Sequence, residues 1–165
     1  MLEKATMADF AELCRLYEAV CGAMEATGLR QWHWGRYPAP QDVEEDLRQG
    51  WLYVYREEGE ILCALAVNQE QDPLYADIPW RYAGTPGLFH RVAVSPAAQG
   101  KGLARRALHE VEDILRAQGC TVLRGDTFSL NRNALRLYER LGMEKAGELH
   151  FEGFEEPFIA LEKKL

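Results

Sequence analysis

Phe89 to Ala104 read FHRVAVSPAAQGKGLA, and this stretch carries the clearest structural signal in the chain. Its first part, through Val94, is rich in the apolar and branched side chains that strands favour. Pro96 has no amide hydrogen to donate to a neighbouring strand and should therefore end this one. A helix with a buried apolar stripe is expected to follow from about Leu103 to Gln118. The stretch is thus predicted to form a strand, a loop and a helix.

The loop Gln99-Gly100-Lys101-Gly102 has the composition of an anion-binding turn. Glycines lack a β-carbon, so the backbone can turn sharply and bring its amides against a ligand. Amides at a helix start lack partners and lie at the positive end of the helix dipole, which suits a phosphate. Taken alone, the two glycines could equally do no more than make the turn. No Ser or Thr follows the lysine as in a nucleotide P-loop, and Arg105 stands where a dinucleotide motif needs its third glycine.

Two motifs in this chain resemble those of one enzyme family. Gln99 to Ala104 resembles the central motif of the GNAT superfamily of acyl-CoA-dependent N-acetyltransferases, written Q/R-x-x-G-x-G/A. Asn131 to Gly142 resembles the second motif of the family, N-x-x-A-x-x-x-Y-x-x-x-G. The resemblance implies one GNAT-like domain over residues 1–165. The implied fold is α/β, with a mixed, mostly antiparallel central sheet, helices on both faces, and central strands that splay into a V-shaped cofactor cleft.

The resemblance also implies a binding site for acetyl-CoA as the acyl donor. Main-chain groups of the central strand would pair with the pantetheine arm, and the amides of the glycine loop would hold the pyrophosphate. Asn131 matches the asparagine that contacts the pantetheine or caps its helix. The cofactor-binding residues expected from these matches are Val92, Ala93, Val94, Gln99, Gly100, Lys101, Gly102, Leu103, Ala104 and Asn131.

Tyr138 is the expected general acid. Acetyl transfer from a thioester to an amine needs a neutral amine, a stabilised oxyanion and a proton for the departing thiolate. In many members of the family the tyrosine that Tyr138 matches protonates this thiolate. From helical spacing alone, its ring would only pack in the core.

The general base is expected to be Asp126, five residues before Asn131. It matches the glutamate used as a base in ribosomal-protein N-terminal acetyltransferases. Because aspartate is shorter, it could act through a water. Three alternatives stay open: Asp126 pairs with Arg124, His90 is the base because its ordinary pKa suits the task, or water chains act with no single base.

Three aromatic segments are candidates for the acceptor site: Trp32 to Tyr37, the long loop from Gln69 to Gly87, and the last hairpin around Phe151 and Phe154. The rings of Trp32, Trp34 and Tyr37 either plug the core or wall a substrate pocket. The acceptor is expected to be a primary amine on a small molecule or a peptide. The candidate substrate contacts are Trp32, Trp34, Tyr37, Trp80 and His90.

The remaining elements follow from periodicity and turn residues. Thr6 and Asp9 are expected to cap a helix with a buried stripe from Phe10 to Met24. The side chains of Glu44, Glu45 and Asp46 are expected to face solvent. Gly119 is expected to end the helix that begins near Leu103, and Gly142 to end a further helix near Arg132–Arg140. The other expected elements are a helix over Gln41–Gln49 and strands over Leu2–Ala5, Trp51–Arg56, Ile61–Asn68, Cys120–Phe128 (interrupted by Gly125), Met143–Phe151 and Phe154–Leu161.

Composition limits the classes of molecule that this protein is expected to bind. The net charge of −7 argues against a general binder of nucleic acid or of acidic membranes. The first residues contain no long apolar run, so neither a signal peptide nor a membrane anchor is expected. The four cysteines lie within apolar patterns, as buried thiols of a cytoplasmic protein would, and no spacing suggests a metal site. The oligomeric state stays open, with a homodimer among the alternatives.

These observations predict direct acetyl transfer in a ternary complex, because no cysteine is placed in the motifs as a nucleophile. Two rivals come from other classes of protein. One is a non-catalytic acyl-CoA-binding module of the same fold. The other is an interaction domain in which the glycine turn binds nothing.

Overall fold

The computed structural model describes all 165 residues, which group into two compact units. The first unit comprises Met1–Val67 and His90–Glu110, and the second comprises Asn68–Phe89 and Val111–Leu165. Strand β4 (Pro86–Val94) and helix α3 (Leu103–Ala117) each contribute residues to both units. The organisation of residues 1–165 as a single domain stays a prediction.

Seven strands form one sheet in the order β1-β2-β3-β4-β5-β7-β6. The sheet is mostly antiparallel, and β4 and β5 form a parallel pair whose register runs from Pro86↔Val122 to Leu88↔Arg124. Together with four α-helices, this confirms the predicted α/β class. The splayed cofactor cleft stays a prediction.

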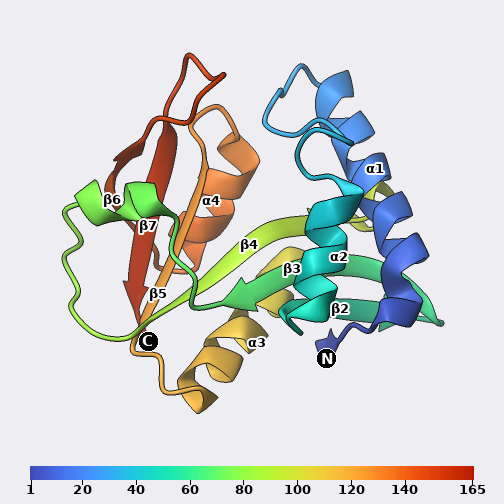
Figure 1. Cartoon of the computed structure of the whole chain (residues 1–165), viewed down its shortest axis with the longest axis horizontal. Coiled ribbons are helices and arrows are strands. Elements are labelled where there is room, and N and C mark those ends of the chain that lie inside the picture. The colour runs from blue at the N-terminus through green and yellow to red at the C-terminus, as the bar shows by residue number, and fades with distance from the viewer. The chain divides into compact units, whose positions relative to one another are not determined.

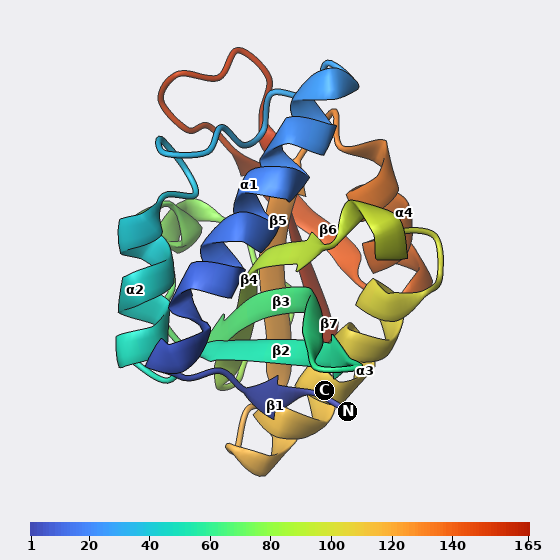
Figure 2. The same cartoon turned by 90° about the vertical axis from the view of Figure 1, so that its right-hand side faces the viewer.

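The first unit begins with an antiparallel set of three strands. These are β1 (Glu3–Lys4), β2 (Leu52–Glu57) and β3 (Glu60–Asn68), paired in that order. Helix α1 (Phe10–Ala26) crosses these strands with α2 (Pro40–Arg48) beside it, as Figure 2 shows. The Thr6 amide donates to the Asp9 carboxylate at 2.8 Å, so the predicted capping pair forms, around a 3-10 turn that precedes α1.

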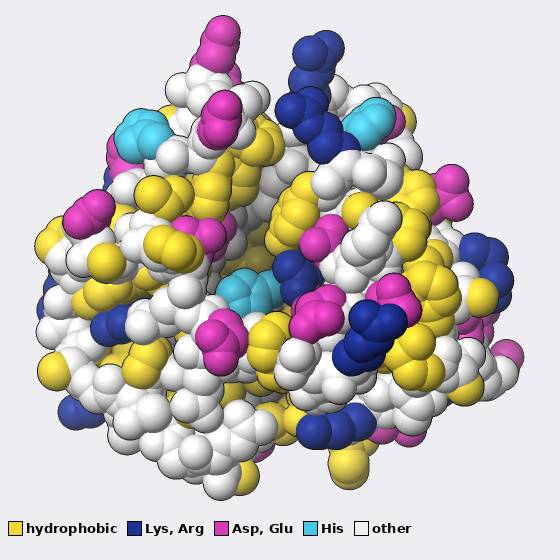
Figure 3. Space-filling view, in the orientation of Figure 1, with side chains coloured by type: hydrophobic (Ala, Val, Ile, Leu, Met, Phe, Trp, Pro, Cys, Tyr) yellow, Lys and Arg dark blue, Asp and Glu magenta, His cyan; other side chains and the backbone are white.

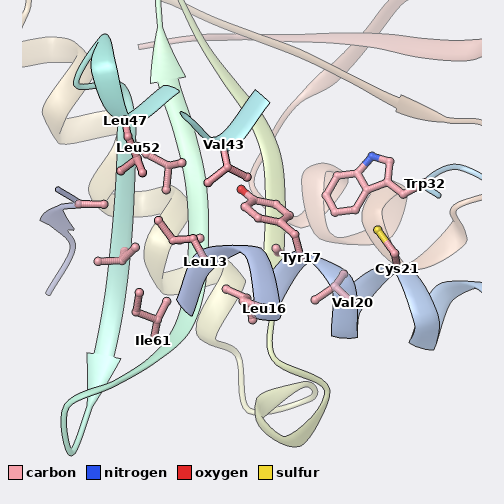
Figure 4. Packing of buried hydrophobic residues seen from close by; sticks show 14 residues of the cluster. Leu13, Leu16, Tyr17, Val20, Cys21, Trp32, Val43, Leu47, Leu52 and Ile61 are labelled. Carbon is pink, nitrogen blue, oxygen red and sulfur yellow. The ribbon is translucent and has the colours of Figure 1, made fainter. Parts of the chain in front are cut away.

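The core of the first unit lies beneath α1. Figure 4 shows Tyr17 between Val43 and Trp32, with Cys21 close to the Trp32 ring. The stripe predicted for this helix is confirmed, because its apolar positions at spacings of three and four are buried or packed against this cluster. The residues that α1 buries are Leu13, Leu16, Tyr17, Val20 and Cys21.

The second unit is built on β7 (Phe158–Lys164), which lies between β5 (Val122–Phe128) and β6 (Glu144–Leu149) and is antiparallel to both (Figure 1). Helix α4 (Arg132–Arg140) connects β5 to β6. Gly125 was predicted to interrupt this strand, but β5 continues through it. A Cβ there would lie 2.9 Å from the Phe89 ring, so the glycine leaves room for this ring beside a continuous strand.

The sequence predicted that the last strand begins at Phe154, but it begins at Phe158. Phe151 and Phe154 each pack edge-on against the Phe158 ring, with centroids 4.9 Å apart in both pairs. Such edge-to-face pairs stabilise a turn beyond their buried area. Pro157, which has no amide to donate, also delays the strand.

The charged side chains are mostly solvated. Figure 3 shows acidic and basic groups interspersed on one face of the molecule. Lys145–Glu148 at 2.7 Å is one such exposed ion pair, and Glu44–Arg48 at 2.5 Å is another, which contributes at most about 1 kcal/mol. No helix has the length and apolar character needed to cross a bilayer.

Candidate active site

Strand β4 contains a strained residue just before the positions that were predicted to pair with a cofactor. Arg91 adopts a φ of +51°, in the left-handed region that residues other than glycine rarely occupy. Such a conformation costs about 1–3 kcal/mol and persists only where the surroundings enforce it. Outliers of this kind cluster at functional sites, which makes β4 a candidate for one.

Three residues of the first unit hold Arg91 in this conformation. Its guanidinium donates to the Asp46 carboxylate from Nη2 at 2.6 Å and from Nε at 3.0 Å. Nη1 donates to the Tyr37 hydroxyl at 3.1 Å. The carbonyl of Arg91 accepts a hydrogen bond from the Tyr17 hydroxyl at 2.9 Å. The side chain and the main chain of the strained residue are therefore both fixed.

The expectation that Asp46 is solvated is wrong, because its residue is only 2% exposed. Its sequence position carried a signal for this. Val43, Asp46 and Leu47 are spaced as i, i+3 and i+4, so they share one face of α2, and the other two are apolar. An acidic residue on a core-facing stripe is expected to have a buried partner, here Arg91.

The loop after β4 has the geometry of an anion-binding turn. The Gln99 side chain donates from Nε2 to the Val94 carbonyl at 3.1 Å and closes the base of the loop. Gly100 and Gly102 have φ values of +77° and +75°, and the space around both is open. The hydrogen-bond ladder of α3 starts with the Arg106 amide, which donates to the Gly102 carbonyl at 3.1 Å. The amides from Gly100 onward precede that ladder, so these residues fit a phosphate or diphosphate group.

In the second unit, Tyr138 lies on α4 and is only 5% exposed. Asn131 caps this helix, because its side-chain oxygen accepts from the Ala134 amide at 3.1 Å. The Tyr138 ring packs on Phe89 with centroids 5.2 Å apart. Burial, together with the nearby charge of Asp126, raises the pKa of Tyr138 above its ordinary value. Its hydroxyl therefore keeps its proton at neutral pH and can serve as a donor.

Asp126 lies on β5, and its Oδ2 accepts a hydrogen bond of 2.6 Å from the Tyr75 hydroxyl. Burial raises the pKa of Asp126 to about 6, although the hydrogen bond from Tyr75 opposes the rise. A carboxyl group with this pKa is mostly ionised at neutral pH and can still accept a proton. The alternative pairing with Arg124 is not found, since that guanidinium donates to Gln71 and to the Tyr82 carbonyl.

His90 is less suited to proton transfer than its ordinary pKa suggested. Burial and the neighbouring charge of Arg91 lower the pKa of its imidazole to about 4. The ring is therefore neutral at pH 7 and a weak base.

The protein matches the model of the Acetyltransferase (GNAT) family over residues 15–143. The match covers both motifs and every strand from β2 to β5. The chain belongs to the GNAT family.

Solved structures agree with this assignment. A protein from Staphylococcus aureus Mu50 that is assigned as an acetyltransferase is 28% identical, with a TM-score of 0.76 over 99% of this chain and 98% of that one. A GNAT-family acetyltransferase from Streptococcus agalactiae 2603 shares the fold at 23% identity, with a TM-score of 0.86 over 100% and 95%. A protein from Salmonella typhimurium, also assigned as an acetyltransferase and solved with its cofactor acetyl-CoA, shares the fold at 21% identity, with a TM-score of 0.71 over 100% and 93%.

Membership of the GNAT family indicates acetyl transfer with acetyl-CoA as the donor. The sequence motifs for this activity fall on the glycine loop in the first unit and on α4 in the second. Arg91, Asp46 and Tyr75 lie outside both motifs and were not recognised from the sequence.

The aromatic residues expected at the acceptor site lie in different environments. Trp32 is buried in the core, 6.1 Å from the Tyr17 ring, as the core alternative predicted. Trp34 packs partly buried against the same cluster, whereas Tyr37 is 44% exposed. In the second unit, Trp80 donates from Nε1 to the Tyr75 carbonyl at 2.9 Å. A role in substrate binding stays a prediction for each of them.

Proposed function

We propose that this GNAT protein transfers the acetyl group of acetyl-CoA to a primary amine, on a small molecule or a peptide, by direct attack in a ternary complex. The proposal is carried by the glycine loop from Gln99 to Ala104, whose amides precede the hydrogen-bond ladder of α3. A diphosphate is the part of acetyl-CoA that such a loop binds best. The mobile charge of Lys101 adds to this preference.

The remaining cofactor contacts come from main-chain groups. Acetyl-CoA supplies an acetyl group that is activated as a thioester. The proposal assigns main-chain groups of Val92, Ala93 and Val94 to the pantetheine arm, and the fixed conformation of Arg91 orients the strand at this point. The Asn131 side chain accepts from Ala134, and the proposal assigns it a contact with the pantetheine in addition to this cap.

Two side chains carry the proton transfers. Asp126 accepts a proton from the amine, directly or through one water, as the nitrogen–carbon bond forms. Tyr138 donates its hydroxyl proton to the sulfur as the carbon–sulfur bond breaks. The directions of their pKa shifts support these roles, because Asp126 is mostly ionised at neutral pH and Tyr138 stays protonated.

Direct transfer is favoured over an acyl-enzyme by the state of the cysteines. Burial raises the pKa of Cys21 to about 11 and that of Cys63 to about 12. Burial also raises the pKa of Cys14 and that of Cys120. Since the thiolate is the nucleophilic form of cysteine, these thiols are poor nucleophiles at neutral pH.

A thiol-release screen tests the function. The protein is incubated with acetyl-CoA and a panel of amino acids, polyamines, aminoglycosides and N-terminal peptides, and products are identified by mass spectrometry. We expect N-acetylated product to form at the same rate as free coenzyme A. The lines in double-reciprocal plots of the initial rates should intersect. Tight acetyl-CoA binding without turnover on any amine would favour the non-catalytic module, and parallel lines with an acetylated cysteine would contradict direct transfer.

Gly102→Ala is expected to weaken acetyl-CoA binding. Alanine at a φ of +75° is strained by about 1–2 kcal/mol, and relief of this strain would turn the loop amides away from the diphosphate. A loss of about tenfold in affinity corresponds to 1.4 kcal/mol. The measurement is calorimetric titration with acetyl-CoA.

Gly119→Ala is the matched control, since Gly119 ends α3 at a φ of +81° with open space around it. Both variants should lose similar stability in urea, while only Gly102→Ala loses affinity. An equal loss of affinity in both would show that the loop is not the binding element.

A further inference from the structure

Tyr75 is fixed at its position by its own segment of the second unit. It lies in a 3-10 turn, Pro73–Asp77, within the long loop between β3 and β4. Asp72 caps this turn, since its side chain accepts from the Leu74 amide at 2.8 Å, and the Tyr75 amide donates to the Asp72 carbonyl at 2.9 Å. The cap and this main-chain hydrogen bond therefore hold the backbone of Tyr75 in place.

The ring of Tyr75 is held as firmly as its backbone. It is 2% exposed and lies 5.2 Å, centroid to centroid, from the Trp80 ring. The Arg124 guanidinium covers Trp80 at 4.2 Å from the ring centroid and also donates to Gln71 and to the Tyr82 carbonyl. Because these partners all belong to the long loop, Arg124 fastens that loop to β5.

The consequence of this packing is that one hydroxyl is aimed at one carboxylate oxygen. The Tyr75 hydroxyl donates to Asp126 Oδ2 at 2.6 Å, a length typical of a strong bond to a carboxylate. Burial and the charge of Asp126 raise the pKa of Tyr75 well above its ordinary value, so this hydroxyl remains a donor at every pH of interest. The hydroxyl does not engage the second oxygen, Oδ1.

We propose that Tyr75 is the positioning residue for the base Asp126: its hydroxyl holds Oδ2 and so orients Oδ1 to accept the proton of the acceptor amine. The inference rests on the proposed function, since it takes Asp126 as the base. Tyr75 itself touches neither reactant, so its effect is transmitted through the carboxylate.

The groups that face Asp126 determine whether loss of the Tyr75 hydroxyl raises or lowers the pKa of this carboxyl group. Tyr75 and Asp72 face it from the loop and Tyr138 from α4, while Ala160, its partner on β7, is uncharged. The hydrogen bond from Tyr75 lowers the pKa of Asp126, whereas burial and Asp72 raise it. Without the Tyr75 hydroxyl, the carboxyl group must therefore hold its proton to a higher pH, and activity must be lost at a higher pH on acidification.

The experiment is the pH profile of kcat/KM for the best acceptor amine, from pH 5 to 9, in four proteins. The unchanged protein should lose activity on acidification with a midpoint near the Asp126 pKa of about 6. Tyr75→Phe should move this midpoint up by about one pH unit. Its plateau of kcat/KM at high pH should stay within about tenfold of that of the unchanged protein, because the base itself is still present. Asp126→Asn should lose most of its activity, and its profile should no longer show the fall of kcat/KM on acidification (the acid limb).

Tyr82→Phe is the matched control. Tyr82 belongs to the same loop, and its hydroxyl also donates to a carboxylate, that of Glu144, at 2.7 Å, but at an exposed site. This variant should leave the midpoint unchanged. A plateau that falls in Tyr75→Phe with no movement of the midpoint would show a merely structural role and overturn the inference.

The outcomes separate this inference from the proposed function. If Asp126→Asn abolishes the acid limb and Tyr75→Phe leaves it unmoved, the role of Tyr75 is refuted and the transferase assignment stands. If no amine is acetylated, the function itself fails. Should Tyr75→Phe not fold, 3-fluorotyrosine at position 75 keeps the ring and makes its hydroxyl a stronger hydrogen-bond donor. The midpoint should then move to lower pH, and an unmoved midpoint in this protein would overturn the inference.

Discussion

Tyr138→Phe is expected to lower kcat by about 10²–10⁴-fold, the contribution typical of a positioned general acid. The affinity for acetyl-CoA should change little, because phenylalanine keeps the ring that packs on Phe89 at 5.2 Å. A kcat loss without a binding loss is the signature of an interaction made only in the transition state. Steady-state kinetics and calorimetric titration with acetyl-CoA measure the two quantities.

The control for this prediction is Tyr53→Phe. Tyr53 is also a buried tyrosine, at 8% exposure, but it lies on β2 outside both motifs. This variant should keep its kcat within about twofold of normal, as expected of a substitution away from the chemistry. Equal kcat values for Tyr138→Phe and the unchanged protein would remove Tyr138 from the mechanism and favour a water as the proton donor.

Asp46→Ala is expected to destabilise the protein by about 3–5 kcal/mol, which is the usual cost of leaving one member of a buried ion pair without its partner. Three hydrogen bonds from the Arg91 guanidinium end on this carboxylate, and the residue is 2% exposed. Arg91 also holds the strained φ of +51°, so its release removes the restraint on β4. Urea unfolding at constant pH gives the free energy of unfolding.

Glu44→Ala provides the comparison on the same helix. Glu44 pairs with Arg48 at 2.5 Å, but both side chains are exposed, so the loss should be below about 1 kcal/mol. Similar losses for Asp46→Ala and Glu44→Ala would mean that the ion pair with Arg91 does not hold the strand.

The parts of this structure that the sequence predicted are those with a local signal. Glycines at positive φ end helices where the pattern placed them, as at Gly119 and Gly142. The apolar spacing located α1 and α3, and the two motifs located the glycine loop and Tyr138. Each of these features depends on residues only a few positions apart in the chain.

The features that the sequence did not predict depend on partners far apart in the chain. Asp46 and Arg91 are 45 positions apart, and Tyr75 and Asp126 are 51 apart. No periodicity connects such residues. The acidic run that contains Asp46 therefore suggested solvent exposure, and the proline-rich loop gave no sign that Tyr75 is ordered. The strained φ of Arg91 follows from these tertiary contacts and has no signature of its own in the sequence.

The central claim is that the amides of the loop after β4 bind the diphosphate of acetyl-CoA. Amide chemical-shift mapping by ¹H–¹⁵N NMR, with acetyl-CoA and then with acetyl-pantetheine, which lacks the diphosphate, tests it directly. We predict large shifts for the amides of residues 99–104 with acetyl-CoA and small ones with acetyl-pantetheine. Unmoved loop amides at saturating acetyl-CoA, or equal shifts with both compounds, would contradict the account.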